Sequence, residues 1–295
     1  MSMNTPNEIK NYQIRINSLL DRAVPLSNNN SNLNDAMRYA VISGGKRIRP
    51  LLIYSSGLCL GAQVNKLDAP AVSIELLHAF SLVHDDLPSM DNDDLRRGLP
   101  TTHKKFSEAT AILAADALQT LSFELIANSG SLSDYEKTQL VSLIAKACGS
   151  SGMTGGQSID LASEGKTLTK SELHEMYSMK TGALIHASIM APFCIIDESS
   201  QDIRAMMSEF AWILGLAFQI RDDLLDIEES SEVIGKTANS DIKNNKATWP
   251  AIFGIQESHN YCDELLKKCI KHLEFFNHKA DPLRWLTNYL INRKY

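Results

Sequence analysis

The sequence of 295 residues contains few cysteines, and they follow no disulfide or metal-binding pattern. The five occur singly, without a CxxC pair or a Cys/His cluster, at Cys59, Cys148, Cys194, Cys262 and Cys269. Zinc sites need thiolate and imidazole ligands at short, regular spacing, so this scatter argues against one. An odd number of dispersed cysteines predicts reduced thiols.

Long hydrophobic runs are also missing. The longest, residues 210–220, contains Gln219 and is shorter than the roughly 20 residues that cross a bilayer. It predicts a buried core helix. Residues 1–20 are polar and lack the apolar segment of a secretory signal. Together these features predict a cytoplasmic protein without a membrane anchor.

The chain has no excess of basic residues, since its formal net charge is −6. Nucleic-acid binders need a basic face to displace counterions from phosphates, and no basic stripe is present. A GxxxxGK[ST] loop is absent too, so nothing supports nucleotide hydrolysis. Lysines and arginines instead stand beside Gly and Asp, which suits a small anionic ligand.

Strand patterns are scarce, and apolar residues recur mostly at helical spacing. The predicted helical segments are 35–60, 69–87, 108–128, 136–149, 171–190, 203–228 and 247–256. Several are apolar on every side, which is typical of helices buried inside a bundle. No linker or repeat divides the chain, so we expect one all-α domain over residues 1–295. The polar stretch 228–246 predicts a lid or binding loop.

The first group of candidate functional residues is acidic and lies in HDDLPSMDNDDLRRG. It comprises Asp85, Asp86, Asp91, Asp93 and Asp94. Pro88 prevents a regular continuation of the helix, so the later carboxylates can curl back toward Asp85. Oxygen ligands in this arrangement suit Mg²⁺, which uses one or two protein carboxylates together with substrate phosphates.

A second acidic group follows another strongly apolar helix, in FQIRDDLLD. Asp222 and Asp226 are one helical turn apart, so their side chains lie on the same face of the helix. For either acidic group alone, a solvated helix end is an adequate alternative. Both together are harder to explain in that way, because unpaired carboxylates beside apolar surface repel one another unless cations lie between them.

A third group is basic, in SGGKRIRP. Gly44 and Gly45 let backbone N–H groups approach a ligand, while Lys46 and Arg49 stand three residues apart and can face the same way. This arrangement predicts a diphosphate pocket. A loose basic turn on the surface is an equally good interpretation of this motif taken alone.

In this order, the motifs resemble the trans-isoprenyl diphosphate synthase family, and within it the bacterial-type farnesyl diphosphate synthases. The resemblance runs from about Asn34 onward and includes GGKRIRP, ELLHAFSLVHDDLPSMDNDDLRRG, GGQSIDL, KTGAL, FQIRDDLLD and the dipeptide GK at 235–236. It implies a bundle of roughly ten or more helices around a deep central cavity, usually paired as a homodimer. The implied substrates are isoprenoid diphosphates and the implied cofactor is Mg²⁺.

The resemblance also implies roles for individual residues. Metal ligands would be Asp85, Asp86 and Asp91 on one wall and Asp222, Asp223 and Asp226 on the other. The allylic diphosphate would be held by Arg96, Lys180 and Lys236, and isopentenyl diphosphate by Lys46, Arg49, His78 and Arg97. Thr181 and Gln219 would lie beside the allylic cation, so the residues expected to act in catalysis are Lys180, Thr181, Gln219, Asp85 and Asp86.

Three of these side chains have plainer interpretations. His78 precedes Asp85 by seven residues and so shares its helix face, but a lone histidine in an apolar helix is more often a hydrogen-bonded core residue. The same ambiguity applies to Gln219. The ambiguity extends to Asp160, in GGQSIDL, which is expected to be structural or to support the site, since it could equally orient a lysine or arginine.

Product length is expected to depend on Phe80 and the neighbouring Ser81. Phe80 lies five residues before Asp85, roughly 8 Å down the helix axis, where an aromatic ring would form a floor beneath a growing chain. In the family, an aromatic residue there with the two extra residues of DDLPSMD accompanies a C15 product. The alternative is that Phe80 only packs against neighbouring helices.

Other activities stay open on sequence grounds. A geranylgeranyl or geranyl diphosphate synthase would differ only in where the pocket ends. A terpene cyclase uses similar acidic sites but needs no GGKRIRP pocket, and a non-catalytic partner subunit would have lost acidic motifs that are intact here. Ala247 and Trp249 depart from the usual family residues, and Arg293 and Lys294 resemble its basic terminus, although terminal basic residues are commonly just solvated.

Overall fold

The computed structural model describes residues 5–26, 32–196, 200–228 and 246–293. The α-helices are α1 (Asn7–Ala23), α2 (Asn32–Ile42), α3 (Ile48–Leu60), α4 (Asp68–Asp85), α5 (Thr102–Lys105), α6 (Glu108–Ala127), α7 (Asp134–Cys148), α8 (Met153–Ala162), α9 (Lys170–Tyr177), α10 (Ala183–Met190), α11 (Gln201–Glu228), α14 (Trp249–Phe253), α15 (Ile255–Leu273) and α16 (Asp281–Asn292). Shorter 3₁₀ turns are η1 (Val64–Leu67), η3 (Ala191–Cys194) and η4 (His278–Ala280), and η2 (Ser178–Gly182) is π-helical. In the described part of the chain, the only strands are β1 (Leu95–Arg96) and β2 (Leu99–Pro100), which form an antiparallel hairpin. The all-α prediction is confirmed.

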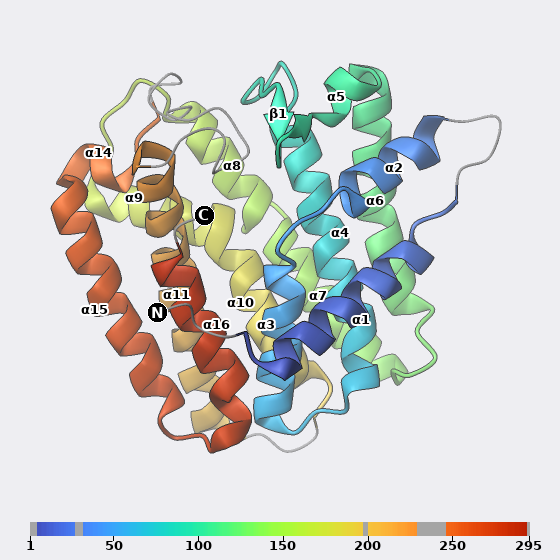
Figure 1. The fold of residues 1–295 in the computed structure, drawn as a ribbon, viewed down its shortest axis with the longest axis vertical. Helices are drawn as coiled ribbons and strands as arrows, with labels where there is room; N and C mark the ends of the chain where they lie inside the picture. The colour runs from blue at the N-terminus through green and yellow to red at the C-terminus, as the bar shows by residue number, and fades with distance from the viewer. Residues whose placement is uncertain (1–4, 27–31, 197–199, 229–245, 294–295) are drawn as a thin grey trace.

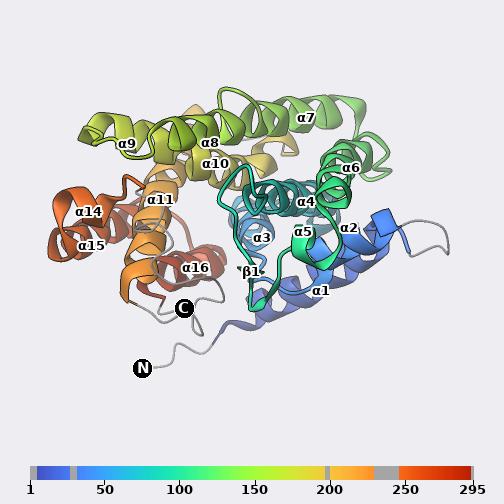
Figure 2. The ribbon, with the colours of Figure 1, turned by 90° about the horizontal axis from the view of Figure 1, so that it is seen from above.

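The helices are arranged around α3, α4 and α11. Seen from above, α7, α8, α9 and α10 form one layer, and α1 and α2 lie on the opposite side of α3 and α4 (Figure 2). Figure 1 shows α14, α15 and α16 beside α11, whereas α6 and α2 flank α4. Two hydrophobic clusters result, one around α4 and α6 and the other around α11 and α15.

The segment 35–60, expected as one helix, is broken into α2 and α3, so that expectation was wrong at its centre. Gly44 and Gly45 have φ angles of 112° and 125°, and Arg47 has a φ of 56°. These left-handed conformations cannot continue a right-handed helix. The break leaves a turn in front of α3 that presents its backbone and basic side chains to the centre of the molecule.

The segment 171–190 is interrupted by η2, a π-helical turn between α9 and α10. Helix α8 packs directly on this turn, because a Cβ atom on Gly156 would stand 2.1 Å from the backbone nitrogen of Lys180. A π-turn adds one residue to the helical repeat and redirects the side chains on it. Here it carries Lys180 and Thr181.

Helix α11 is longer than its apolar run suggested. By length and composition alone, α6 and α11 among the described helices are long and apolar enough to cross a membrane. Phe210, Leu214 and Ala217 of α11 are nevertheless fully buried against neighbouring helices. The interpretation of residues 210–220 as a buried core helix therefore agrees with the structure.

Candidate active site

A cavity of about 880 Å³ opens between α3, α4, α8, η2 and α11. Its acidic lining residues are Glu75, Asp85, Asp91, Asp93 and Asp222. Its basic lining residues are Lys46, Arg47, Arg49, Arg96, Arg97, Lys180, Lys246 and Arg293. Most of the residues predicted from the sequence thus meet in one space. Lys236 and Lys294 lie outside the described residues.

The chain after α4 turns back on itself, as Pro88 predicted. The Asp91 backbone N–H donates to the carbonyl of Asp85 over 2.9 Å, and Asn92 adopts a left-handed φ of 52°. This turn brings Asp91 to the same cavity as Asp85. The first acidic motif therefore presents Asp85 and Asp91, together with Asp93, to one cavity.

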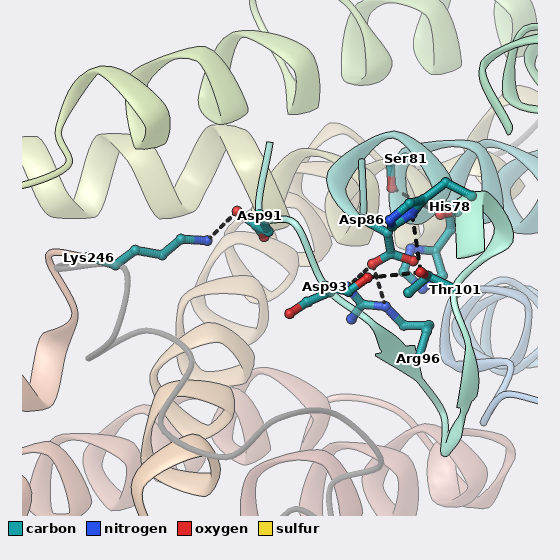
Figure 3. Close-up of polar contacts among 9 residues, drawn as sticks. His78, Ser81, Asp86, Asp91, Asp93, Arg96, Thr101 and Lys246 are labelled. Atoms are coloured by element: carbon teal, nitrogen blue, oxygen red, sulfur yellow. Dashed lines mark hydrogen bonds and ion pairs between the residues drawn. The ribbon is translucent and has the colours of Figure 1, made fainter. Parts of the chain in front are cut away.

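Asp86 is placed differently from its neighbour. It is buried and does not line the cavity, and its carboxylate accepts from both Nε and Nη2 of Arg96 (Figure 3). The same Nη2 donates to Asp93 over 3.2 Å. Thr101 ties that turn to the hairpin by donating to the Asp93 carbonyl. Asp86 and Asp93 therefore hold Arg96 at the rim of the cavity.

The pKa values of the carboxyl groups in this motif shift in different directions. Burial raises the pKa of Asp85, and it raises the pKa of Asp86 to about 6 against the opposing charge of Arg96. Burial would also raise the pKa of Asp91, but Lys246 and Lys180 outweigh it and leave that pKa below its usual range. A cation at Asp85 would relieve the cost of burying its charge.

The second acidic motif is divided in the same way. Asp222 lines the cavity, whereas Asp223 and Asp226 are buried outside its lining. The Asp223 carboxylate accepts from the Tyr177 hydroxyl, from Gln219 Nε2 over 2.9 Å and from the Trp249 backbone N–H over 3.2 Å. Asp223 is therefore a structural anchor in this state, although the sequence grouped it with the metal ligands.

Gln219 and Thr181 are joined by a hydrogen bond. The Thr181 hydroxyl donates to Gln219 Oε1, and Gln219 in turn donates to Asp223. Both Thr181 and Gln219 line the cavity. This relay fixes the amide so that its oxygen and the threonine hydroxyl form one polar edge beside the space between the acidic motifs.

Lys180 emerges from the π-turn next to this relay. Its Nζ lies 2.5 Å from Asp160 Oδ2, so Asp160 orients a lysine as expected. Burial alone lowers the pKa of Lys180, but Asp160, Asp85 and Asp91 outweigh it and raise that pKa above its ordinary value. Lys180 is therefore a permanent cation between the two acidic walls.

Lys246 is a site residue that the sequence analysis did not identify. Its Nζ lies 2.7 Å from Asp91 and 3.7 Å from Asp160 (Figure 3). The partners are 155 positions apart in the chain, so no local spacing predicts the pair. The sequence offered only one indication of this role, a lysine two residues before Thr248, where the next helix begins. Lys246 gives the acidic end a second lysine.

A basic pocket in the same cavity contains Lys46, Arg49, His78 and Arg97. Burial lowers the pKa of Lys46 to about 8, helped by the nearby Arg293, and lowers that of Arg49 to about 10. Burial and the surrounding arginines also depress the pKa of His78, which is therefore neutral at pH 7. Burial and mutual repulsion destabilise the charged forms of Lys46 and Arg49, so an incoming anion that offsets these charges is favoured.

Gly45 lies where Arg97 crosses the turn and has a φ of 125°, which favours glycine. Arg97 donates to the Gly44 carbonyl, and a Cβ atom on Gly45 would stand 2.9 Å from the Arg97 guanidinium carbon. Arg47 also lines the cavity, but its guanidinium forms a buried ion pair with Glu75 over 3.0 Å. Among the basic residues of this turn, the charge of Arg47 is therefore already neutralised by a buried partner.

Phe80 and Ser81 lie farther along α4 and both line the cavity. The Phe80 ring packs edge-on to the His84 ring, with centroids 5.1 Å apart. The Ser81 hydroxyl donates to the His78 carbonyl, so it is already hydrogen-bonded (Figure 3). Phe80 thus places an aromatic ring in the cavity lining, and its role in product length stays a prediction.

The chemistry of the donors determines which ion this site suits. Asp85, Asp91 and Asp222 offer only oxygen ligands, which a hard divalent cation prefers. Over the described ranges, however, no three Asp, Glu, His or Cys side chains converge closely enough to enclose an ion. The residues fit Mg²⁺ that completes its coordination with phosphate oxygens, and not a closed protein cage.

Comparison with known proteins identifies relatives whose names agree with a site for diphosphate substrates. The Polyprenyl synthetase family matches residues 30–282. A farnesyl diphosphate synthase of Haemophilus influenzae is 40% identical over 97% of this chain and 98% of its own. Geranylgeranyl pyrophosphate synthase 4 of Arabidopsis thaliana is 39% identical over 95% of this chain and 76% of its own.

Solved structures share the arrangement of helices. A crystal structure of the geranyltransferase from Helicobacter pylori, complexed with magnesium and isoprenyl diphosphate, superimposes with a TM-score of 0.87. The two chains are 32% identical, and the match covers 99% of this chain and 98% of the other. The similarity therefore extends over the whole cavity and is not limited to short motifs.

Proposed function

The chain belongs to the polyprenyl synthetase family, and from this premise we propose that it condenses isopentenyl diphosphate with dimethylallyl and geranyl diphosphates to form farnesyl diphosphate. The observation that carries the proposal is one cavity with two separate anion sites. One site combines Asp85 and Asp222 with lysines, and the other is the basic pocket of Lys46, Arg49 and Arg97, whose charge Glu75 and Asp222 offset only in part. Joining two diphosphate esters requires both.

The acidic end is the proposed site of the allylic diphosphate. Asp85, Asp91 and Asp222 would hold Mg²⁺, while Arg96, Lys180 and Lys246 face the same space. When bound there, Mg²⁺ supplies positive charge that stabilises the diphosphate as it leaves carbon. The three basic side chains add fixed positive charge at the same oxygens.

The proposed reaction begins when the allylic carbon–oxygen bond breaks and its electron pair leaves with the diphosphate. The partial negative charges of Thr181 Oγ1 and Gln219 Oε1 stabilise the allylic cation that results. The double bond of isopentenyl diphosphate then attacks, so a bond forms between its C4 and allylic C1. A proton is lost to the departed diphosphate, which restores a double bond, and no protein nucleophile is needed.

A test of this function asks whether both substrates are needed. We expect wild-type protein to release diphosphate rapidly from geranyl diphosphate only when isopentenyl diphosphate is also present, and to stop when EDTA removes Mg²⁺. Rapid release from geranyl diphosphate alone, with a hydrocarbon product, would indicate a cyclase. No release, with stimulation of another synthase, would indicate a partner subunit.

The basic pocket predicts a pH dependence. Free Lys46 has a pKa of about 8, so it carries a positive charge below that pH and loses it above. Because kcat/KM reports the free enzyme, kcat/KM for isopentenyl diphosphate should fall above pH 8, approaching about tenfold per pH unit. In Lys46→Arg the charge persists, and the profile should stay flat to about pH 9.5. Identical profiles in the two proteins would exclude Lys46 as the titrating group.

We also propose that the chain is a single domain that works as a homodimer in the cytoplasm, without a membrane anchor. Helix α6 exposes Ile112 and Leu113, which are 43% and 58% accessible, on the side away from α4. An apolar helix face of this kind suits a self-complementary contact with a second copy. The free cysteines fit a reducing compartment.

The dimer predicts a clear effect of charge on α6. Leu113→Asp should convert the protein to a monomer in sedimentation-velocity experiments, because a carboxylate would be buried without a partner in the interface. Leu26→Asp, at another exposed leucine, should leave the dimer intact. A wild-type protein that sediments as a monomer would contradict the dimer itself.

A further inference from the structure

Arg293, the residue after α16, lines the cavity and is the last described residue of the chain. It is only 8% exposed, and its guanidinium carbon lies 4.4 Å from the centroid of the Phe218 ring. Its Nη2 donates to Asp222 Oδ1 over 2.6 Å. The singly charged guanidinium of Arg293 therefore occupies the Asp222 carboxylate, which is a metal ligand in the proposed function.

Arg221 holds Arg293 in this position. Its Nε and Nη2 donate two hydrogen bonds to the Arg293 carbonyl, over 2.9 and 2.7 Å. Arg221 is 9% exposed and lies directly before Asp222 on α11, and its Nη1 faces Glu228 over 3.4 Å. Two consecutive residues of α11 therefore bind Arg293: Arg221 donates to its carbonyl, and Asp222 accepts from its guanidinium.

The grip on the guanidinium is incomplete. Among the described residues, the buried Nε of Arg293 has no hydrogen-bond partner. The opposite wall has a similar occupant, since Lys246 lies on Asp91, but Lys246 also has Asp160 within 3.7 Å (Figure 3). Displacing Arg293 from Asp222 therefore breaks one ion pair of a guanidinium that already has one unpaired N–H group. Displacing Lys246 from Asp91 would leave Lys246 with Asp160 as an acidic partner.

We propose that Arg293 is a built-in counter-cation for Asp222, kept there by Arg221 as a positioning residue, and that the metal-bound diphosphate must displace it. The Arg293 side chain is 7% exposed, so its charge would be costly to bury without the Asp222 carboxylate, whose side chain stays 47% exposed. The same contact competes with the metal. Arg221 thereby sets the metal concentration at which the site fills, and this inference rests on the proposed function of Asp222.

The test measures metal binding without turnover. Mn²⁺ is titrated into the whole protein with inorganic diphosphate present, and the loss of the free Mn²⁺ paramagnetic resonance signal reports binding. Arg293→Gln should lower the apparent dissociation constant three- to tenfold, and Arg221→Lys, which keeps the charge but loses the two-pronged grip, should lower it about threefold. Lys279→Gln, a matched loss of one charge at an exposed site, should leave it unchanged.

A double variant separates positioning from bulk charge or stability. If Arg221 acts through Arg293, Arg221→Lys should have no further effect in the Arg293→Gln background. Unchanged or weaker Mn²⁺ binding in Arg293→Gln would overturn the competition, and additive effects would overturn the role of Arg221. Condensation by the wild type is measured separately, so a failure here with an active wild type refutes this inference and leaves the proposed function intact.

Discussion

Replacing Asp85 with Asn should lower the rate of condensation by about a thousandfold, equivalent to about 4 kcal/mol of transition-state stabilisation. Asp85 lines the cavity at the end of α4, opposite Asp222. An amide retains the shape but not the negative charge that holds Mg²⁺ against the leaving diphosphate. Steady-state kinetics at saturating Mg²⁺ measure the loss, and a higher metal requirement should accompany it.

Asp94 provides the matched control because it belongs to the same motif. Its side chain is exposed, lies outside the cavity lining and pairs with Lys104 over 2.8 Å. Asp94→Asn should therefore change the rate less than threefold. Similar losses in the two variants would mean that the motif acts through its fold and not through a carboxylate in the cavity.

Replacing Phe80 with Ala should change the main product from C15 to C20 or longer. The ring lies along α4 below Asp85, and its removal opens space between α4 and its neighbours for another five-carbon unit. Chromatography of the dephosphorylated alcohols measures the shift. The thermal transition is recorded as well, because losing a buried ring typically costs about 3–5 kcal/mol when the site cannot collapse.

Phe106→Ala tests whether any lost ring has this effect. Phe106 packs edge-on against Tyr39, outside the cavity lining. Its variant should still produce C15. An unchanged C15 product from Phe80→Ala would leave Phe80 as a packing residue only, and would place the end of the pocket elsewhere.

Much of the fold was predictable because buried helices leave a strong period in the sequence. The residues 203–228 read as one helix and form most of α11. The period did not reveal where helices break, as between α2 and α3, because left-handed backbone at Gly44, Gly45 and Arg47 is a local property of a few residues. The π-turn at Lys180 is invisible to periodicity for the same reason.

The site was predictable in composition but not in geometry. Spacing places Asp222 and Asp226 on one helix face, yet only Asp222 lines the cavity. Asp86 and Asp223 read as ligands, but Arg96 and Tyr177 engage them. Tyr177 comes from a distant element and Arg96 reaches Asp86 only because the chain turns back after α4, so tertiary packing decides which carboxylate faces the ligand.

The most direct test of the central claim sizes the product made by the unmodified protein. Purified protein is incubated with radiolabelled isopentenyl diphosphate and geranyl diphosphate, with Mg²⁺ or with EDTA, and the alcohols are separated after dephosphorylation. The structure predicts a C15 alcohol that forms with Mg²⁺ and disappears with EDTA. Absence of any condensed product under saturating Mg²⁺ would contradict the claim that one cavity binds and joins two diphosphates.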